Sequence, residues 1–520
     1  MKDKKKNGEF LQERMPDLQI LAEEMRAGPQ KTRKRTKKNK VSNKEFARVT
    51  YFFVALFLAL MGYIVYFNAV RSKEIINSPY NVRLDSMADR VVRGKILDKV
   101  GIVLAETIVS EDGTETRKYP YGEVFAHVVG YDVMGKSGLE STENFHLLTS
   151  NAFFLERVVK EIREEKNIGD NIVTTLDTKL QKTAYDALGN YKGAVMVMEA
   201  STGKVLAMVS KPTFNPNTIT EDWEWLTTDE DSSLLNRAMQ GAYAPGSIFK
   251  VVTTLEYMRE NAAYQSYSYD CEGEITQGDT TIHCANNRVH GEEDLAHSLA
   301  NSCNAAYSNI GLTLKIESFR ETAKELLFNE KLPSLLPYSQ SKFRLTKESP
   351  DSEIMMTAIG QGKTQVSPYH MTLLTAAIAN GGTLMQPYLV NQITNYSGTT
   401  ITKNLPEKYA TLMTSEEASK LKEYMTGVVE FGTGAALGGE SYTVAGKTGT
   451  AEYSSDKEKS HSWFTGFSNV DNPELVISVV VESADKSGMS AVSVAKQVLN
   501  AYYYLKLRDR DEILSQFVFK

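Results

Sequence analysis

The feature that most constrains this chain is an uncharged run of twenty-two residues, Val49–Val70. A helix of about 20 apolar residues crosses a bilayer. A buried core helix is the alternative, but a helix that is apolar on every face, with aromatic residues toward its ends, suits lipid better. A cleaved signal peptide fits poorly, because its apolar core is usually only about 7–15 residues long. The run therefore predicts a single-pass transmembrane helix.

The charge distribution predicts which way this helix is oriented. Residues 1–49 contain fifteen Lys or Arg and seven Asp or Glu, a formal charge of +8. Because the whole chain of 520 residues carries −6, the residues after position 49 carry −14. Basic segments stay on the cytoplasmic side of a membrane. We therefore expect a cytoplasmic N-terminus and an acidic body outside the cell, and the acidic body disfavours nucleic-acid binding.

Changes in composition divide the chain into four predicted segments. Residues 1–48 form a basic cytoplasmic tail and residues 49–70 the transmembrane helix. Residues 71–170 mix short β-prone runs with polar turns, and residues 171–520 have the texture of a larger domain with strands and helices.

In the larger segment, apolar runs predict strands near both ends of the sequence and helices between them. The expected strands are 193–198, 205–210, 442–445, 462–467 and 475–481, and a final helix is expected from about 490 to 507. Strands contributed by both ends, with helices between, favour a mostly antiparallel sheet of an α+β domain.

The first candidate for chemistry is Ser247-x-x-Lys250. Pro245-Gly246 predicts a turn, and the apolar residues that follow Ser247 have the spacing of a buried helix face. Ser247 would open that helix, and Lys250, three residues later, would lie on the same face. A serine hydroxyl is a weak nucleophile until a base takes its proton, and a lysine whose pKa is lowered by burial is such a base.

A Ser-x-x-Lys sequence alone is a weak signal, because a serine before a helix is usually only a cap. The same spacing occurs in polar or charged sequence, where the lysine would be solvated and protonated, as at Ser201/Lys204 and Ser454/Lys457. Ser247/Lys250 differs from these because an apolar helix follows it.

Two further elements support the same site. Ser302-x-Asn304 is the only Ser-x-Asn in the chain and offers a hydroxyl that can relay a proton and a carboxamide that can hold a peptide bond. Lys447-Thr448-Gly449 offers groups that bind a carboxylate, and a glycine within a strand often marks close approach of a ligand.

Together, in this order, the three elements resemble the motifs of penicillin-binding proteins and serine β-lactamases. Other segments resemble class B penicillin-binding proteins, which carry a non-catalytic pedestal before the transpeptidase domain. These segments are Arg93–Ala105, Gly138–Glu140, Thr175–Asp177, Ile359–Gly362 and Gly432–Gly434. The resemblance implies that residues 71–170 are the pedestal and residues 171–520 a transpeptidase domain with a five-stranded antiparallel sheet flanked by helices.

The resemblance also implies an acyl-transfer reaction. Ser247 would attack the D-Ala-D-Ala bond of a peptidoglycan stem peptide and become acylated, with Lys250 as its general base. Ser302, between Lys250 and Lys447, would pass the proton to the leaving amine. The amine of a second stem peptide would then take the acyl group, and β-lactams would acylate the same serine.

The remaining site residues would bind the substrate. By resemblance, Asn304 would hold the amide side chain, and Lys447 and Thr448 would bind the terminal carboxylate. Gly449 would allow close approach, and the backbone N–H groups of Ser247 and Thr450 would form the oxyanion hole.

Several alternatives remain at this point. A bifunctional class A protein, a secreted β-lactamase and a β-lactam sensor each need sequence features that we do not find. A D,D-carboxypeptidase and a catalytically silent scaffold of the cell-wall machinery stay open. The resemblance implies a SEDS-type glycosyltransferase as membrane partner, and no cofactor.

Cysteine and histidine residues cluster within a short segment of the chain. They are Cys271, His283, Cys284, His290, His297 and Cys303. The cluster invites a zinc hypothesis, but the spacings match no common ligand pair, so we expect no metal site. Cys271 and Cys284 flank a predicted hairpin and could form a disulfide outside the cell, whereas Cys303 is expected to be a buried free thiol.

Overall fold

The computed structural model describes residues 44–67, 87–334, 336–452, 460–484 and 488–518. The chain divides into two units, Met1–Ser72 and Lys73–Lys520. Most of the predicted tail (1–43), the predicted end of the transmembrane helix (68–70) and the first part of the predicted pedestal (71–86) lie outside the described residues.

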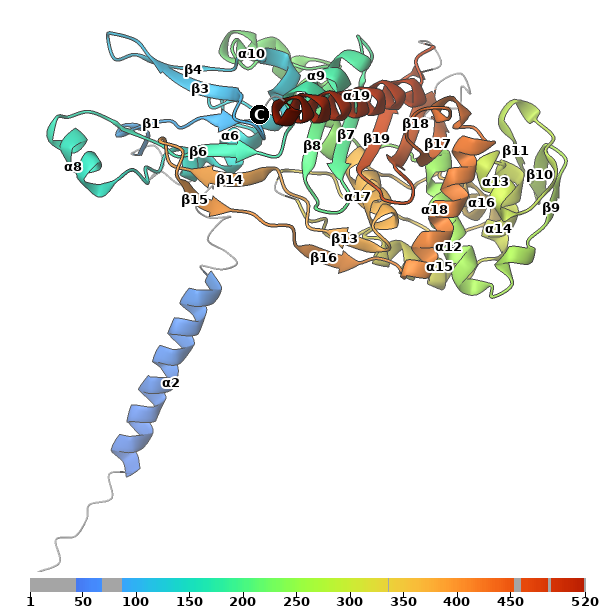
Figure 1. Ribbon diagram of the computed structural model, residues 1–520. Coiled ribbons are helices and arrows are strands. Elements are labelled where there is room, and N and C mark those ends of the chain that lie inside the picture. Colours follow the sequence, from blue (N-terminus) through green and yellow to red (C-terminus); the bar gives the residue numbers. More distant parts are fainter. Residues whose placement is uncertain (1–43, 68–86, 335, 453–459, 485–487, 519–520) are drawn as a thin grey trace, which may run out of the picture. The chain divides into compact units, whose positions relative to one another are not determined.

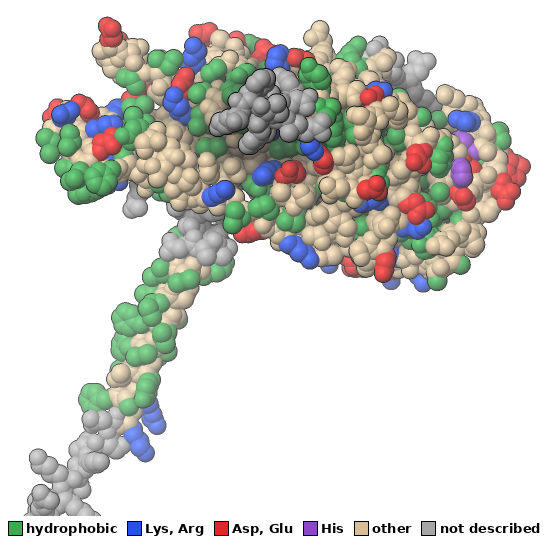
Figure 2. All heavy atoms as spheres, viewed as in Figure 1, with side chains coloured by type: hydrophobic (Ala, Val, Ile, Leu, Met, Phe, Trp, Pro, Cys, Tyr) green, Lys and Arg blue, Asp and Glu red, His purple; other side chains and the backbone are tan. Residues whose placement is uncertain are grey.

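The first unit contributes one long helix, α2 (Lys44–Tyr66). Its segment Phe46–Tyr66 has 21 residues and is long and apolar enough to cross a membrane. At 1.5 Å per residue it measures about 31 Å, close to the thickness of a bilayer core. Figure 2 shows hydrophobic side chains along most of the helix and basic side chains at its lower end. The helix begins five residues before the predicted start at Val49.

The second unit contains two main sheets. The first has six strands in the order β15-β14-β6-β2-β3-β4. In chain order they are β2 (Ile96–Leu97), β3 (Val103–Val109), β4 (Glu115–Lys118), β6 (Asn171–Thr174), β14 (Val390–Thr394) and β15 (Thr400–Lys403). Strands β2 and β6 are parallel and the other neighbours are antiparallel. This sheet therefore joins the N-terminal strands to a hairpin that comes more than 200 residues later.

Short elements surround the six-stranded sheet in the N-terminal part of this unit. They are β1 (Val91–Val92), which pairs in parallel with β5 (Asn167–Ile168), and the helices η3 (Gly122–Phe125), α5 (Ala126–Val129), α6 (Gly138–Thr142), α7 (Asn144–Leu147) and α8 (Phe154–Ile162).

A buried ion cluster holds this region together. The carboxylate of Glu140 on α6 accepts hydrogen bonds from Arg93 Nε at 2.6 Å and Arg117 Nε at 2.8 Å, and its side chain is fully buried. Burial alone would raise the pKa of Glu140, but attraction to Arg117 and Arg93 and their hydrogen bonds hold this pKa below its usual value. Next to Arg93, a Cβ at Gly94 would lie only 2.0 Å from the carbonyl oxygen of Asp170, so this close approach requires glycine.

The second sheet is antiparallel throughout, with the order β17-β18-β19-β7-β8. Its strands are β7 (Gly193–Glu199), β8 (Val205–Lys211), β17 (Val444–Glu452), β18 (Ser460–Ser468) and β19 (Leu475–Val481). The predicted five-stranded antiparallel sheet, with strands from both ends of the domain, is confirmed. The first of the three C-terminal strands, expected at 442–445, instead begins at Val444 and continues to Glu452.

Both faces of this sheet are buried, which explains why its strands are apolar at nearly every position. Along β7, Val195 and Val197 pack in one core with α9 (Thr178–Ala187) and α19 (Ala491–Val518), whereas Met196 and Met198 pack in the other with α17 (Pro368–Ala379). Figure 1 shows α9 and α19 lying together across the sheet. The predicted last helix is confirmed and continues beyond the expected end at 507, to Val518.

Helices and small sheets complete the larger domain. The helices are α10 (Ile219–Thr228), α11 (Arg237–Gln240), η4 (Gly246–Phe249), α12 (Lys250–Glu260), η5 (Tyr264–Ser266), η6 (Ala285–Asn287), α13 (Leu295–Ala300), α14 (Asn304–Thr313), α15 (Ile316–Glu325), α16 (Asp351–Ala358), α18 (Ser415–Glu430) and η7 (Ala435–Leu437). The two-stranded sheets pair β9 (Tyr269–Cys271) with β12 (Gly291–Glu293), β10 (Glu274–Gln277) with β11 (Thr280–His283), and β13 (Thr383–Met385) with β16 (Lys408–Thr411).

The Glu140 cluster gives a prediction about stability. Glu140→Ala would leave two buried guanidinium groups without their carboxylate, which costs about 3–5 kcal/mol of unfolding free energy. We expect a clearly lower denaturation midpoint for the detergent-solubilised full chain. Asp186→Asn is the matched control, because Asp186 and its partner Lys182 are each more than half exposed and exposed ion pairs contribute little.

The pH dependence of the same variants separates charge from packing. Because the pKa of Glu140 is lowered in the folded state, its stabilisation is present above the unfolded-state pKa and is lost as the pH falls through the folded-state pKa. Glu140→Gln should remove that part of the acid sensitivity. An equal loss of stability in Glu140→Ala and Asp186→Asn would contradict this account.

Candidate active site

Ser247 lies in a tight turn that leads directly into a helix. It is the second residue of η4, and α12 begins at Lys250. Gly246, just before it, has φ +55°, and a Cβ there would lie 2.3 Å from the carbonyl oxygen of Thr450 on β17. On its other side the N–H of Gly246 donates to the carbonyl oxygen of Gly360 at 2.8 Å. Glycine at this position therefore brings the turn of Ser247 against the edge of the five-stranded sheet.

Lys250 is completely buried and points toward the start of α14. Its Nζ donates to the carbonyl oxygen of Ser302 at 2.7 Å, to Oδ1 of Asn304 at 2.7 Å and to the hydroxyl oxygen of Ser302 at 3.3 Å. The ring of Tyr307 on α14 lies 5.4 Å from the same nitrogen. The first two sequence elements therefore meet through one ammonium group.

A second lysine, Lys447, also contacts Ser302. This lysine is on β17 and is also fully buried, and its Nζ donates to the Ser302 hydroxyl oxygen and to the carbonyl oxygen of Thr448, each at 3.0 Å. The hydroxyl of Ser302 is thus in contact with the side-chain nitrogens of both lysines. Ser302 itself has φ +58°, an unusual backbone conformation for a residue with a side chain.

Burial changes the protonation of both lysines. It lowers the pKa of Lys250 to about 8, although Cys303, Cys284 and Glu293 nearby act in the opposite direction. Burial and repulsion from Lys250 together hold the pKa of Lys447 well below its usual value. With a pKa of about 8, Lys250 can accept a proton near neutral pH.

The polar groups around the two lysines are also fixed. Asn304 begins α14, and its Nδ2 donates to the carbonyl oxygen of His283 at 2.9 Å. The hydroxyl of Thr448 contacts the hydroxyl of Thr433 at 2.6 Å.

Thr433 was not among the predicted site residues, although the segment Gly432–Gly434 contains it. Tyr307, one helical turn after Asn304, was also missed.

Strand β17 is the edge of its sheet next to the Ser247 turn. At Gly449 a Cβ would lie 3.0 Å from Ile248 and 3.1 Å from Trp463, so this strand passes close to η4. Thr450 is exposed at the same edge, and Gln361 Nε2 donates to its carbonyl oxygen at 3.4 Å. An exposed edge strand can hydrogen-bond to an extended peptide.

Other Ser-x-x-Lys sequences do not converge in this way. Lys204 pairs with Glu199 at 3.8 Å and is partly exposed. A further match, Ser493/Lys496, lies within α19, where Lys496 pairs with Glu440 at 2.9 Å and is also partly exposed. Burial therefore distinguishes Lys250 from these lysines.

Among known families, two models match this chain. The penicillin binding protein transpeptidase domain matches residues 193–502, and the penicillin binding protein A dimerisation domain matches residues 93–172. The chain belongs to the penicillin-binding protein transpeptidase family. The first match contains all three sequence elements of the site.

Named relatives agree with this assignment. The chain is 29% identical over 428 residues to the peptidoglycan D,D-transpeptidase PbpA of Mycolicibacterium smegmatis. This alignment covers 77% of this chain and 86% of the relative. It is 30% identical to PbpA of Mycobacterium tuberculosis, over 74% of this chain and 84% of the relative. A solved structure, the ceftriaxone acyl-enzyme complex of penicillin-binding protein A from M. tuberculosis, has a TM-score of 0.73 and 26% identity, over 80% of this chain and 99% of that one.

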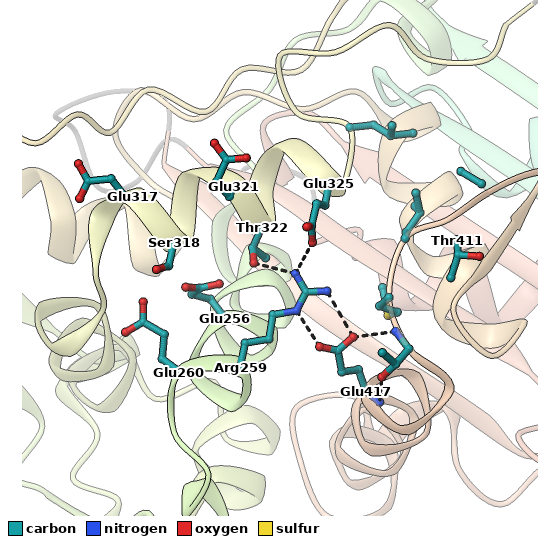
Figure 3. Close-up of a pocket in the computed structure, with 15 residues that line it drawn as sticks. Glu256, Arg259, Glu260, Glu317, Ser318, Glu321, Thr322, Glu325, Thr411 and Glu417 are labelled. Atoms are coloured by element: carbon teal, nitrogen blue, oxygen red, sulfur yellow. Dashed lines mark hydrogen bonds and ion pairs between the residues drawn. The ribbon is translucent and has the colours of Figure 1, made fainter.

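This penicillin-binding protein also has a pocket of about 890 Å³ away from Ser247. Figure 3 shows Arg259 of α12 in it, pointing toward Glu417 of α18 on one side and toward Glu325 and Thr322 of α15 on the other. Arg259 is 2.7 Å from both Glu417 and Glu325. None of the predicted site residues lines this pocket. Its ion pairs hold α15 and α18 to α12, which gives Arg259 a structural role.

A cluster of three cysteines and one histidine lies beside the candidate active site. The ligand atoms of Cys271, Cys284, His290 and Cys303 all lie within 4.8 Å of one another. The sequence spacing did not predict this convergence. The three cysteines are buried and unpaired by disulfides, and Cys303 lies between Ser302 and Asn304.

Proposed function

We propose that this penicillin-binding protein is a serine-type peptidoglycan D,D-transpeptidase that cross-links stem peptides ending in D-Ala-D-Ala. The observation that carries the proposal is the Ser302 hydroxyl, which contacts the buried Nζ atoms of Lys250 and Lys447 at 3.3 and 3.0 Å. Relatives with the name peptidoglycan D,D-transpeptidase support the reaction class.

The first step would be activation of Ser247. With a pKa of about 8, about a tenth of Lys250 is neutral at pH 7. The neutral amine, one helical turn from Ser247, accepts the hydroxyl proton as the oxygen attacks the carbonyl carbon of the penultimate D-Ala. The backbone N–H groups of Ser247 and Thr450 stabilise the negative oxygen that forms.

The second step would be release of the terminal D-Ala. The Ser302 hydroxyl donates a proton to the leaving nitrogen and is reprotonated from Lys250, which took the proton from Ser247. The C–N bond breaks and an ester with Ser247 remains. The amine of a second stem peptide then attacks this ester, forms the cross-link and restores the Ser247 hydroxyl.

Substrate binding would depend on charge at the sheet edge. Burial and repulsion from Lys250 lower the pKa of Lys447. An incoming carboxylate would raise this pKa, favour the protonated lysine and bind to it. The Thr448 hydroxyl would bind that carboxylate next to β17, and Gly449 would allow its close approach. Asn304, held by Lys250 and the carbonyl of His283, is positioned to bind an amide of the stem peptide.

β-Lactams would acylate Ser247 in the same way, because their amide imitates the D-Ala-D-Ala bond. Covalent labelling by a fluorescent penicillin therefore separates an active enzyme from a catalytically silent scaffold. Release of D-Ala with water as the acceptor, and no cross-linked product when an acceptor peptide is supplied, would instead identify a D,D-carboxypeptidase.

We predict that Ser247 is the residue acylated by a fluorescent penicillin. Mass mapping of the labelled full chain should place the adduct on the peptide that contains Ser247, and Ser247→Ala should abolish labelling. Ser201→Ala, from another Ser-x-x-Lys sequence, is the matched control and should label normally. An adduct at any other serine would refute the assignment, and no adduct at all would support the scaffold alternative.

The lowered pKa of Lys250 predicts the pH dependence of acylation. If the neutral amine is the base, the acylation rate constant should rise about tenfold per pH unit below pH 8 and level off above it. Lys250→Ala should acylate at least about 100-fold more slowly, whereas Lys204→Ala should behave as the unmodified chain. A flat rate between pH 6 and pH 8, or fast acylation by Lys250→Ala, would remove Lys250 from the mechanism.

We also propose the topology of the whole chain. The basic tail would lie in the cytoplasm, residues 49–70 would cross the membrane, residues 71–170 would act as the non-catalytic pedestal, and the transpeptidase domain would lie outside the cell. Each basic residue near the anionic inner leaflet contributes about 1 kcal/mol of attraction. A SEDS-type glycosyltransferase that contacts the transmembrane helix and the pedestal would supply the glycan strands.

The partner hypothesis predicts that the sequence of the transmembrane helix matters. Replacing residues 49–70 with an unrelated membrane-spanning segment should keep the protein in the membrane and keep its penicillin labelling, but should weaken co-purification with the glycosyltransferase. Full complementation of a deletion by this chimera would show that the helix is only a tether. Loss of penicillin labelling would mean that the chimera is misfolded, and a second unrelated segment would then be compared.

A further inference from the structure

The cluster of Cys271, Cys284, His290 and Cys303 has the geometry of a metal site. Sγ of Cys284 lies 3.7 Å from Sγ of Cys271 and 3.7 Å from Sγ of Cys303, and Sγ of Cys271 lies 3.4 Å from Nδ1 of His290. In a tetrahedral zinc site with Zn–S bonds of about 2.3 Å, two sulfurs are about 3.75 Å apart, and a sulfur and a nitrogen are about 3.6 Å apart. The observed separations are close to these values.

The surroundings of the sulfurs also suit thiolate ligands. All three cysteines are at most 3% exposed, whereas His290 is partly exposed at the surface side of the cluster. The N–H of Gly273 points at Sγ of Cys271 at 3.4 Å, and the N–H of Ala306 points at Sγ of Cys303 at 3.3 Å. Backbone donors of this kind stabilise negative charge on sulfur and orient it toward a metal.

The four ligands come from four separate pieces of chain. Cys271 ends β9, Cys284 follows β11, His290 precedes β12, and Cys303 caps the N-terminus of α14. A metal would therefore tie the segment of residues 269–293 to the first turn of α14. Ser302 and Asn304 flank Cys303, so the metal would also hold the two residues that accept hydrogen bonds from Lys250.

We propose that these four side chains bind one Zn²⁺ ion, which braces the Ser302–Asn304 segment against the hairpin of β10 and β11. Three sulfurs and one nitrogen in a closed tetrahedron favour zinc over harder cations such as magnesium and calcium. The ion leaves no coordination position for water, so its role is structural. The four zinc ligands would therefore position the residues of the active site and would not touch substrate.

A disulfide is the competing arrangement. A bond between Cys271 and Cys284 requires an S–S distance of about 2.05 Å, and it would leave Cys303 and His290 without a role. The observed equal spacing of Cys284 from both other sulfurs favours a shared ion. The two arrangements differ in a property that is simple to measure, the number of free thiols.

The first experiment uses the full chain purified in detergent without reductant or chelator. We expect about one zinc per chain by elemental analysis, and three thiols that react with a thiol reagent only after denaturation with EDTA. Replacement by Co²⁺ should give the charge-transfer absorption of thiolate ligands. One reactive thiol and no metal would identify the disulfide and overturn the proposal, as would three thiols with no zinc bound when Zn²⁺ is supplied.

The second experiment tests each ligand and its structural effect. His290→Asn and Cys271→Ala should each weaken zinc affinity by at least about 100-fold and lower the thermal unfolding midpoint. His297→Asn is the matched control, because His297 follows His290 closely in the sequence, is more than half exposed and pairs with Asp294. It should bind zinc normally. Unchanged zinc content in both ligand variants would refute the assignment.

The coupling to the active site has its own measurement. We expect metal-free protein, still folded by circular dichroism, to be acylated by penicillin at least tenfold more slowly, and added Zn²⁺ to restore the rate. This measurement rests on the proposed function, whereas metal content, thiol count and unfolding do not, so the two ideas can fail separately. Equal acylation with and without zinc would leave a metal site but would overturn its role as a brace of the active site.

Discussion

The burial of Lys250 is the constraint on which the catalytic half of the molecule depends. A buried ammonium group without hydrogen-bond acceptors costs several kcal/mol, so the chain must supply acceptors at this point. It supplies them from Ser302 and Asn304, which fixes the start of α14 against α12. Ser302 has the left-handed φ of +58°, a conformation that costs of order 1–3 kcal/mol, and its two bonds from Lys250 stabilise this geometry. The same contacts place the hydroxyl of Ser302 beside Lys447.

Much of this architecture is visible in the sequence, because local patterns report local structure. The apolar runs of β7, β8 and β19 and the periodic face after Ser247 predicted elements that the structure contains. The short strands β14 and β15 were not predicted, since their place beside β6 depends on pairing between distant segments and not on periodicity. The convergence of Cys271, Cys284, His290 and Cys303 was missed for the same reason. Familiar spacings such as C-x-x-C describe ligands on one turn, and these ligands lie on four segments.

The residues of the candidate site could be selected from sequence only by combining three weak signals. Ser-x-x-Lys recurs in the chain, and the distinguishing property of Lys250 is its burial, which a motif does not contain. Thr433 is a useful contrast. Its contact with Thr448 crosses from the segment after α18 to β17, and nothing near Thr433 in the sequence indicates that partner.

The six-stranded sheet is joined to the catalytic domain through both layers that cover the five-stranded sheet. On one side, Asp98 accepts a hydrogen bond from Thr178 at the start of α9 at 2.7 Å, and Lys99 pairs with Asp177 at 2.7 Å. On the other side, α17 is followed by β13 and then by β14, which pairs with β6. A displacement of the six-stranded sheet would therefore act on α9 and α17 together. Thr375 of α17 contacts Thr465 of β18 at 2.6 Å, and Thr465 is the register partner of Lys447. A continuous set of contacts therefore connects the N-terminal sheet to a lysine of the candidate active site.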